Sequence, residues 1–318
     1  MDRTAIGPRA KRLLPWAVAA LILWFLLRRI ELSGVIASAG HMDLATFAPV
    51  TLLGVIAWFL LESAAFAYLF TRFNAPVSWR EARGMRGATY LLTPINWNLG
   101  TAAIIVHLRR AKGIAALEAT SSLLLYGLID AVVLVGLTMV GIAALPFSPS
   151  LHSIGRIAAV LLAVELAFLG LFLLRWPRWR WMERMRSLRV FRSHAQATWR
   201  DAAVLLVIRT LYFSGFVLFF WAGAGAFGVA APLSHMAAVV PIILMVGAIP
   251  ITPAGLGTQQ AAMLALLSPY GTEPQILAYG LVYPLALGVA RLPIASMYLG
   301  DFAALRSAVR DARGRSIH

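Results

Sequence analysis

Several apolar runs in this chain are long enough to cross a lipid bilayer as single helices, and they constrain the fold more than any other feature. A spanning helix needs about 20 mostly apolar residues. Because backbone polar groups find no water inside the bilayer, embedded segments must be helices or strands of a closed barrel. Runs at residues 13–27, 44–70, 119–145, 154–174, 201–226 and 275–297 therefore predict an all-α integral membrane protein, a polytopic helical bundle that forms one transmembrane domain over residues 1–318.

The composition agrees with this class and excludes several others. The 318 residues are 60% hydrophobic and 13% charged, whereas soluble domains have about 25% charged residues. There is no cysteine, the six histidines lack metal-ligand spacing, and no phosphate-binding glycine motif is present. We therefore expect no metal, no cofactor and no enzymatic activity. The net charge of +15 comes from basic segments between apolar runs, which is typical of cytoplasmic loops and not of a nucleic-acid-binding surface.

Two further apolar stretches, residues 87–107 and 236–268, are interrupted at their centres. The first contains TPINWNLGT (93–101) and the second contains TPAGLGTQQ (252–260). Proline ends a helix, and glycine permits a tight reversal of the chain. Irregular backbone at membrane depth must be buried in protein or line a wet cavity. Both motifs therefore predict broken helices inside the bundle.

The distribution of Lys and Arg predicts how these stretches cross the membrane. If residues 87–107 enter the membrane and return, 23 of the 28 basic residues lie on the same side as both termini, and 3 lie on the other side. Basic segments are cytoplasmic, so we predict cytoplasmic termini in the cell (inner) membrane and a re-entrant hairpin at 87–107. A second hairpin, at 236–268, then enters from outside, and the halves 1–150 and 151–318 form an inverted repeat.

A short sequence match supports the repeat. Thr93-Pro94 and Thr252-Pro253 open the two motifs and lie 159 residues apart, which is half the chain length. Leu-Gly-Thr closes both motifs, at 99–101 and 256–258. Two breaks in corresponding places predict a substrate site near the midplane of the membrane. The alternative is that each break is a kink or a polar contact between helices.

The residue types in these motifs and in the long runs predict an anionic substrate. A half-helix N-terminus attracts anions, and arginine forms paired hydrogen bonds with phosphate. A charge within an apolar run must face protein or water, and for the arginines a structural ion pair, such as Arg291 with Asp130 or Glu62, is the alternative. The expected substrate-binding residues are Asn96, Asn98, Thr101, Asp130, Arg209, Thr258, Gln259, Gln260 and Arg291.

At these motifs the chain resembles the flippase-like family typified by the transmembrane domain of lysylphosphatidylglycerol synthetases. The resemblance covers about residues 44–300, and it implies lipid translocation without the soluble aminoacyl-transferase domain of the fused enzymes. Thr101, Tyr126 and Gln260 stand where the family has acids. The matching features are Pro253 with Gly255-Leu256-Gly257, Pro94 with Gly100, the basic RRAKGI at 109–114, and LLYGLID at 124–130, which keeps Asp130.

We therefore expect a transporter that moves an anionic lipid, a phospholipid or a polyprenyl-phosphate-linked lipid, between the leaflets. One alternative is a membrane subunit that presents a lipid to a partner enzyme. Another is an intramembrane transferase, although no carboxylate pair or nucleophile–base set is visible. The Arg- and Trp-rich segment 175–200 predicts an interfacial helix at the anionic cytoplasmic leaflet. Glu165, in the middle of an apolar run, is expected to pair with a partner side chain.

Overall fold

The computed structural model describes residues 30–90, 97–146, 149–174, 179–249, 252 and 255–300, together with scattered positions between 17 and 28. All regular structure within these ranges is helical. This confirms the predicted all-α polytopic membrane protein, whereas the predicted first run, 13–27, lies mainly outside the described residues. The helices long and apolar enough to cross a membrane are α3 (Leu44–Phe73), α6 (Ala116–Ala143), α7 (Pro149–Leu173), α10 (Trp199–Ala226) and α13 (Glu273–Met297).

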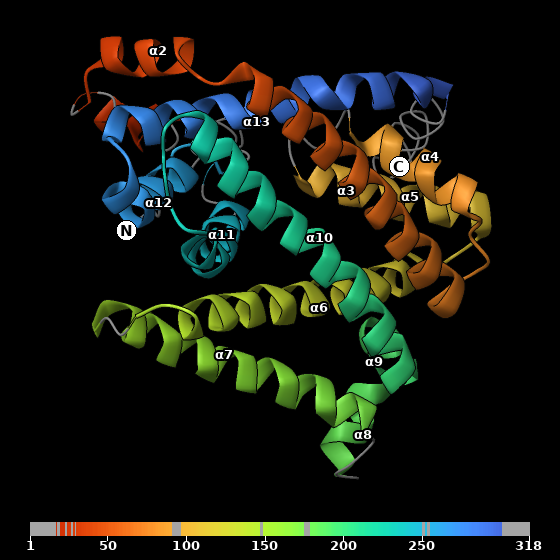
Figure 1. Ribbon diagram of the computed structural model, residues 1–318. Helices are drawn as coiled ribbons and strands as arrows, with labels where there is room; N and C mark the ends of the chain where they lie inside the picture. The colour runs from red at the N-terminus through yellow and green to blue at the C-terminus, as the bar shows by residue number, and fades with distance from the viewer. Residues whose placement is uncertain are drawn as a thin grey trace, which may run out of the picture.

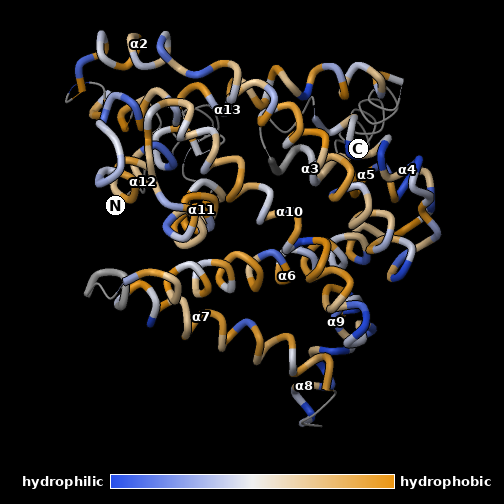
Figure 2. Tube along the Cα trace, viewed as in Figure 1, coloured by the Kyte–Doolittle hydropathy of each residue, from blue (hydrophilic) through white to orange (hydrophobic). Residues whose placement is uncertain are grey.

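The spanning helices pack around a core that is dominated by large apolar and aromatic side chains. Helix α3 runs alongside α10, and α6 packs against α7 (Figure 1). On the other side of the bundle, α13 packs against α3 and against the short helix α2 (Leu32–Gly40). Hydrophobic residues predominate along α6, α7 and α10, whereas hydrophilic residues gather on the short helices α4 (Trp79–Thr89), α8 (Arg180–Ser187) and α9 (Arg192–Gln196) (Figure 2).

The first interrupted stretch forms two short helices, α4 (Trp79–Thr89) and α5 (Trp97–Lys112). Helix α4 begins at a capping box, because the Ser78 hydroxyl accepts from the Glu81 amide at 3.2 Å and the Glu81 carboxylate accepts from the Ser78 amide at 2.8 Å. The Nζ of Lys112 lies 2.7 Å from Glu81 Oε1. The end of α5 therefore lies beside the start of α4, and the chain reverses its direction between the two helices.

The second interrupted stretch has the same construction, with helices α11 (Leu233–Ala248) and α12 (Thr258–Leu267). Near the start of α11, His235 Nε2 lies 2.9 Å from the carbonyl oxygen of Leu266, near the end of α12. The turn between these helices contains Gly255 and Gly257, whose φ angles of 71° and 86° lie in the left-handed region that favours glycine. In Figure 1 the α4–α5 pair and the α11–α12 pair lie at opposite ends of the molecule.

One boundary of the first hairpin was wrong. The hairpin was predicted to begin at residue 87, after a basic segment that separates two apolar runs, whereas α4 begins at Trp79. The sequence Ser78-Trp79-Arg80-Glu81 is a capping-box pattern, and this signal could have found the helix. The correction matters for the site, because it places Arg86 inside the protein at 4% exposure.

The Arg- and Trp-rich segment folds into helix α8 (Arg180–Ser187), a 3₁₀ turn η1 (Arg189–Phe191) and helix α9 (Arg192–Gln196). Trp179 and Trp181 are exposed, and a position at the membrane interface stays a prediction for them. Helix α9 is fixed to α6, because the Ser193 amide donates to the Ser121 hydroxyl at 2.9 Å. The segment between α7 and α10 is thus held against the bundle.

A buried charge cluster as candidate binding site

Arg209 on α10 and Asp130 on α6 form a two-point ion pair inside the bundle. The Nε of Arg209 lies 2.5 Å from Asp130 Oδ1, and its Nη2 lies 3.0 Å from Oδ2. Arg209 is 2% exposed, whereas the side chain of Asp130 keeps 23% of its surface accessible. A guanidinium held at two points has a fixed plane, so Asp130 sets the orientation of Arg209.

A second ion pair joins α3 to α4. Arg86 Nη2 lies 2.5 Å from Glu62 Oε2, and the two residues are 4% and 1% exposed. Removing a charge from water costs several kcal/mol unless a partner compensates it. Each partner therefore needs the other, and the pair fixes the first short helix of the hairpin to the long helix α3.

Aromatic rings surround the Arg209 guanidinium. Its Cζ lies 4.5 Å from the ring centre of Tyr126, 3.9 Å from that of Tyr212 and 4.7 Å from that of Phe213. These distances are suited to cation–π attraction. The Arg209 Nη1 and the Tyr126 hydroxyl are buried and have no hydrogen-bond partner within the described ranges. Two hydrogen-bonding groups are thus directed into the interior, where a ligand oxygen or water could use them.

Arg291 on α13 is half-buried and joins these charges. Glu62, Arg86, Asp130, Arg209 and Arg291 are together called the buried charge cluster. The Cζ of Arg291 lies 5.1 Å from the ring centre of Tyr90, and the Cζ of Arg86 lies 4.8 Å from the same ring. Arg291 forms no ion pair in the part of the chain that the structure describes, and its buried Nε has no hydrogen-bond partner there.

The expected alternative partners of Arg291 were wrong, because both carboxylates pair elsewhere. Asp130 pairs with Arg209, and Glu62 pairs with Arg86. Arg86 was missed as a member of the cluster because it was placed in a loop. The expected pairing of Glu165 also does not appear in the described ranges, where its buried Oε2 has no hydrogen-bond partner.

The predicted residues of the second hairpin lie at its turn. Gln260 is 1% exposed; its Oε1 accepts from the Gly257 amide at 2.6 Å, and its Nε2 donates to the Gly280 carbonyl at 2.8 Å. The Thr258 hydroxyl donates to the Gly255 carbonyl at 3.0 Å. A Cβ on Gly247 would lie 3.0 Å from the Gln259 amide, so Gln259 packs against the end of α11. Gln260 therefore fixes the turn to α13 through both of its polar atoms.

The predicted residues of the first hairpin are less fully described. Thr101 lies half-buried on α5. Asn98 belongs to α5, but its side chain lies outside the described parts, and Asn96 lies outside the described residues altogether. The substrate site predicted at the two breaks includes residues 93–96, 253 and 254, which lie outside the described residues.

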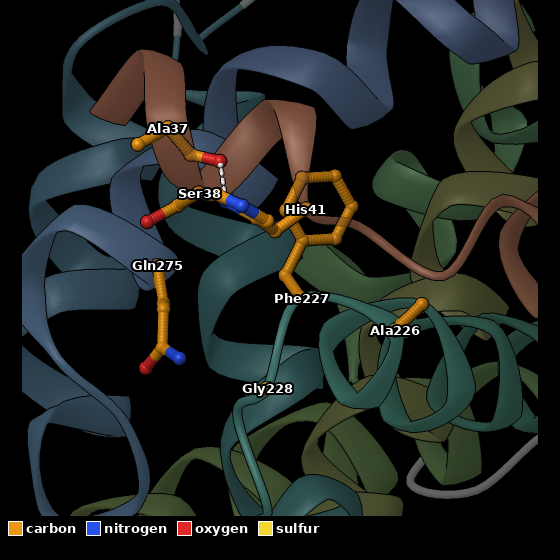
Figure 3. Close-up of a pocket in the computed structure, with 7 residues that line it drawn as sticks. All are labelled: Ala37, Ser38, His41, Ala226, Phe227, Gly228 and Gln275. Atoms are coloured by element: carbon orange, nitrogen blue, oxygen red, sulfur yellow. Dashed lines mark hydrogen bonds between the residues drawn. The ribbon is translucent and has the colours of Figure 1, made fainter. Parts of the chain in front are cut away.

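A hollow of about 280 Å³ lies elsewhere, where the ends of α2 and α10 meet the start of α13 (Figure 3). His41 Nδ1 lies 2.8 Å from the Ala37 carbonyl, and Gln275 faces the hollow from α13. No Lys, Arg, Asp or Glu is among the residues lining this hollow, which makes the buried charge cluster the better candidate for an anion. Within the described ranges no group of three His, Asp or Glu side chains could hold a metal ion.

A family model described as the lysylphosphatidylglycerol synthase TM region matches residues 12–292. The matched range includes both pairs of short helices and all five members of the buried charge cluster. No curated protein matches the chain.

Proposed function

The chain belongs to the family of the lysylphosphatidylglycerol synthase TM region, and from this premise we propose that it is a transporter that moves an anionic lipid between the leaflets of its membrane. The substrate is a phospholipid or a polyprenyl-phosphate-linked lipid. The observation that carries the proposal is the buried charge cluster. A single charge at the bilayer centre costs about 2.5–3.5 kcal/mol on insertion scales, so a bundle that retains five of them uses them for a ligand or for structure.

The unpaired atoms of the cluster supply the headgroup contacts in this proposal. Arg209 Nη1 and the Tyr126 hydroxyl are directed into the interior without partners in the described residues, and Arg291 adds a second guanidinium. Phosphate oxygens accept charge-assisted hydrogen bonds from such groups. The headgroup passes through the cluster, while the acyl or polyprenyl chains stay in the surrounding bilayer.

The two pairs of short helices are the moving or gating parts of this transporter. We propose that both are re-entrant hairpins in an inverted repeat, with both termini in the cytoplasm. The close approach of Glu81 to Lys112 and that of His235 to Leu266 support this, because each brings the two open ends of a hairpin together. The packing is also consistent with a repeat, since α6 lies against α11 and α13 lies against α4.

A vesicle assay tests the proposal. Purified protein is reconstituted into phosphatidylcholine vesicles that contain phosphatidylglycerol with a fluorescent acyl chain. A membrane-impermeant reductant bleaches the label in the outer leaflet, and further loss of fluorescence reports lipid that has crossed. We expect wild-type protein to accelerate this second phase and Arg209→Gln to slow it. The assay is repeated with a polyprenyl phosphate and with a pH or Na⁺ gradient. The proposed transport is rejected if empty vesicles and wild-type vesicles show equal rates under all of these conditions.

One observation favours a second candidate, a non-catalytic subunit that presents a lipid to a partner enzyme. The family resemblance implies acids at three positions that here hold Thr101, Tyr126 and Gln260, and both polar atoms of the Gln260 side chain bond within the protein. If those acids drive transport in relatives, this chain binds a lipid without moving it. Saturable lipid binding without translocation, together with a stoichiometric partner on purification, would favour this candidate.

A further inference from the structure

The charges of the buried cluster do not balance. The cluster contains three arginines, Arg86, Arg209 and Arg291, and two carboxylates, Glu62 and Asp130. The two carboxylates each pair with one arginine, which leaves Arg291 without an ion pair in the described residues. The parts of the hairpin turns that lie outside the described ranges, residues 91–96, 250, 251, 253 and 254, contain no charged residue in the sequence. Among the described residues, the cluster therefore has one positive charge that no acid pairs with.

The position of Arg291 makes this charge unfavourable when it is alone. Arg291 and Arg86 both approach the Tyr90 ring, at 5.1 Å and 4.8 Å, so two positive charges lie against one ring and repel each other. Tyr90 itself is 3% exposed, and the weak screening of the interior strengthens this repulsion. An anion beside Arg291 would relieve it and would supply the acceptor that the Arg291 Nε lacks.

We propose that the site is matched to a headgroup with a net charge of minus one, a monoanionic phosphodiester, and that Arg291 is the residue that sets this charge preference. The inference rests on the proposed function and narrows its substrate class. A monoanion makes the cluster electrically neutral. A zwitterionic headgroup leaves the positive charge in place, and a dianionic monoester introduces a net negative charge, so both are disfavoured in a medium of low dielectric constant.

The first experiment compares three lipids in one detergent at pH 8. These are phosphatidylcholine, with no net charge, phosphatidylglycerol, with one negative charge, and a polyprenyl monophosphate, with close to two. Binding is measured by displacement of a fluorescent phosphatidylglycerol from the full-length protein. We expect phosphatidylglycerol to displace the probe at about tenfold lower concentration than either other lipid.

Charge variants then test the role of Arg291. Arg291→Gln should weaken phosphatidylglycerol binding about tenfold and bring it close to that of phosphatidylcholine, whereas Arg291→Lys should keep the order of the three lipids. Asp130→Asn adds one uncompensated positive charge, so it should move the preference toward the dianionic monophosphate. Arg156→Gln is the matched control, because Arg156 is an exposed arginine on α7 and its loss should leave the order unchanged.

The outcomes separate this inference from the proposed function. If no anionic lipid binds the wild-type protein, the proposed function fails. If phosphatidylglycerol binds but Arg291→Gln keeps the same preference, or if the monophosphate binds best to the wild type, the charge matching is wrong. Should Arg291→Gln not fold, as judged by gel filtration, the Asp130→Asn shift and the wild-type order still decide the question.

Discussion

Glu81 and Lys112 form an ion pair of 2.7 Å that joins the start of α4 to the end of α5. The two residues lie 31 positions apart, on either side of the TPINWNLGT break. Their contact therefore brings the outer ends of α4 and α5 together, as in a hairpin. The same relationship recurs in α11 and α12, through His235 and Leu266. These contacts give the topology an experimental test.

The first prediction concerns sidedness. The chain has no cysteine, so single cysteines can be introduced without background. Arg83→Cys and Lys112→Cys should both react with an impermeant maleimide from the cytoplasmic side of sealed vesicles, and His41→Cys should react from the other side. Reaction of Arg83→Cys and Lys112→Cys from opposite sides would show that residues 87–107 cross the membrane fully, and the inverted repeat would then be abandoned.

The second prediction concerns the Arg209–Asp130 pair. Removing one partner of a buried ion pair leaves an uncompensated charge and costs about 3–5 kcal/mol. We expect Asp130→Ala and Arg209→Met each to lower the free energy of unfolding in mixed micelles by about 3 kcal/mol, since Asp130 is partly accessible. The double variant should lose less than the sum of the two single losses. Additive losses would mean that the two side chains do not interact in the folded protein.

The sequence predicts a feature of this protein well when neighbouring residues determine it, and poorly when contacts between segments far apart in the sequence determine it. The lengths of the apolar runs and the Pro and Gly breaks are local properties, so the five long helices α3, α6, α7, α10 and α13 were predicted correctly. Separate short helices lie on either side of each break. Which acid pairs with which arginine is determined by packing between helices that are far apart in sequence. Arg209 and Asp130 are 79 positions apart, and nothing in their neighbouring residues distinguishes this pair from Arg291 with Asp130.

The same reasoning explains why two further assignments differed from the structure. Arg86 was taken as a loop residue because the segment 71–86 is basic, although the Ser78–Glu81 capping box begins a helix there. Gln260 was expected to bind substrate because amides can donate and accept. Its two hydrogen bonds, to Gly257 and Gly280, depend on α13 lying beside α12, and this packing has no signature in the local sequence.

The third prediction concerns Gln260. In Gln260→Leu the Gly257 amide and the Gly280 carbonyl would lose their buried partner, and each unsatisfied group costs about 1–3 kcal/mol. We therefore expect a loss of about 2–4 kcal/mol in the free energy of unfolding. Gln260→Glu introduces the acid of the family; it keeps the acceptor for Gly257 but needs a proton to donate to Gly280. Its thermal stability should therefore rise relative to wild type as the pH is lowered, and a pH-independent difference would contradict this geometry.

The fourth prediction concerns His194, which lies on α9 outside the spanning helices. Its ring is 2% exposed and lies among Phe168, Phe172 and Phe191, and burial lowers the pKa of His194 from 6.5 to about 4. Below pH 6.5 the unfolded chain binds a proton at this residue that the folded chain does not bind. The free energy of unfolding should therefore fall as the pH drops from about 6.5 to about 4.

The variant His194→Phe fits this aromatic surrounding and removes the titration. Melting temperatures of wild type and His194→Phe are plotted against pH between pH 4 and pH 8. The two plots should have the same slope near pH 7, and the wild-type melting temperature should fall relative to that of His194→Phe as the pH drops toward 4. His41→Gln, at an exposed position, serves as the control and should follow the wild-type curve. Parallel curves for wild type and His194→Phe throughout would show that His194 is not buried in neutral form.

The fifth prediction concerns the close packing of α6 against α11. A Cβ on Gly141 would lie 2.2 Å from the Ala238 backbone nitrogen, whereas a Cβ on Gly136 of the same helix would meet nothing within 4 Å. Gly141→Ala must therefore separate the two helices, and we expect it to lower the free energy of unfolding by about 1–3 kcal/mol. Gly136→Ala should be neutral or stabilising by up to about 1 kcal/mol, because alanine favours the helix. Equal melting temperatures for the two variants would contradict the observed contact. Because α11 is the first helix of the second hairpin, a selective loss in Gly141→Ala would also show that this hairpin is held by α6.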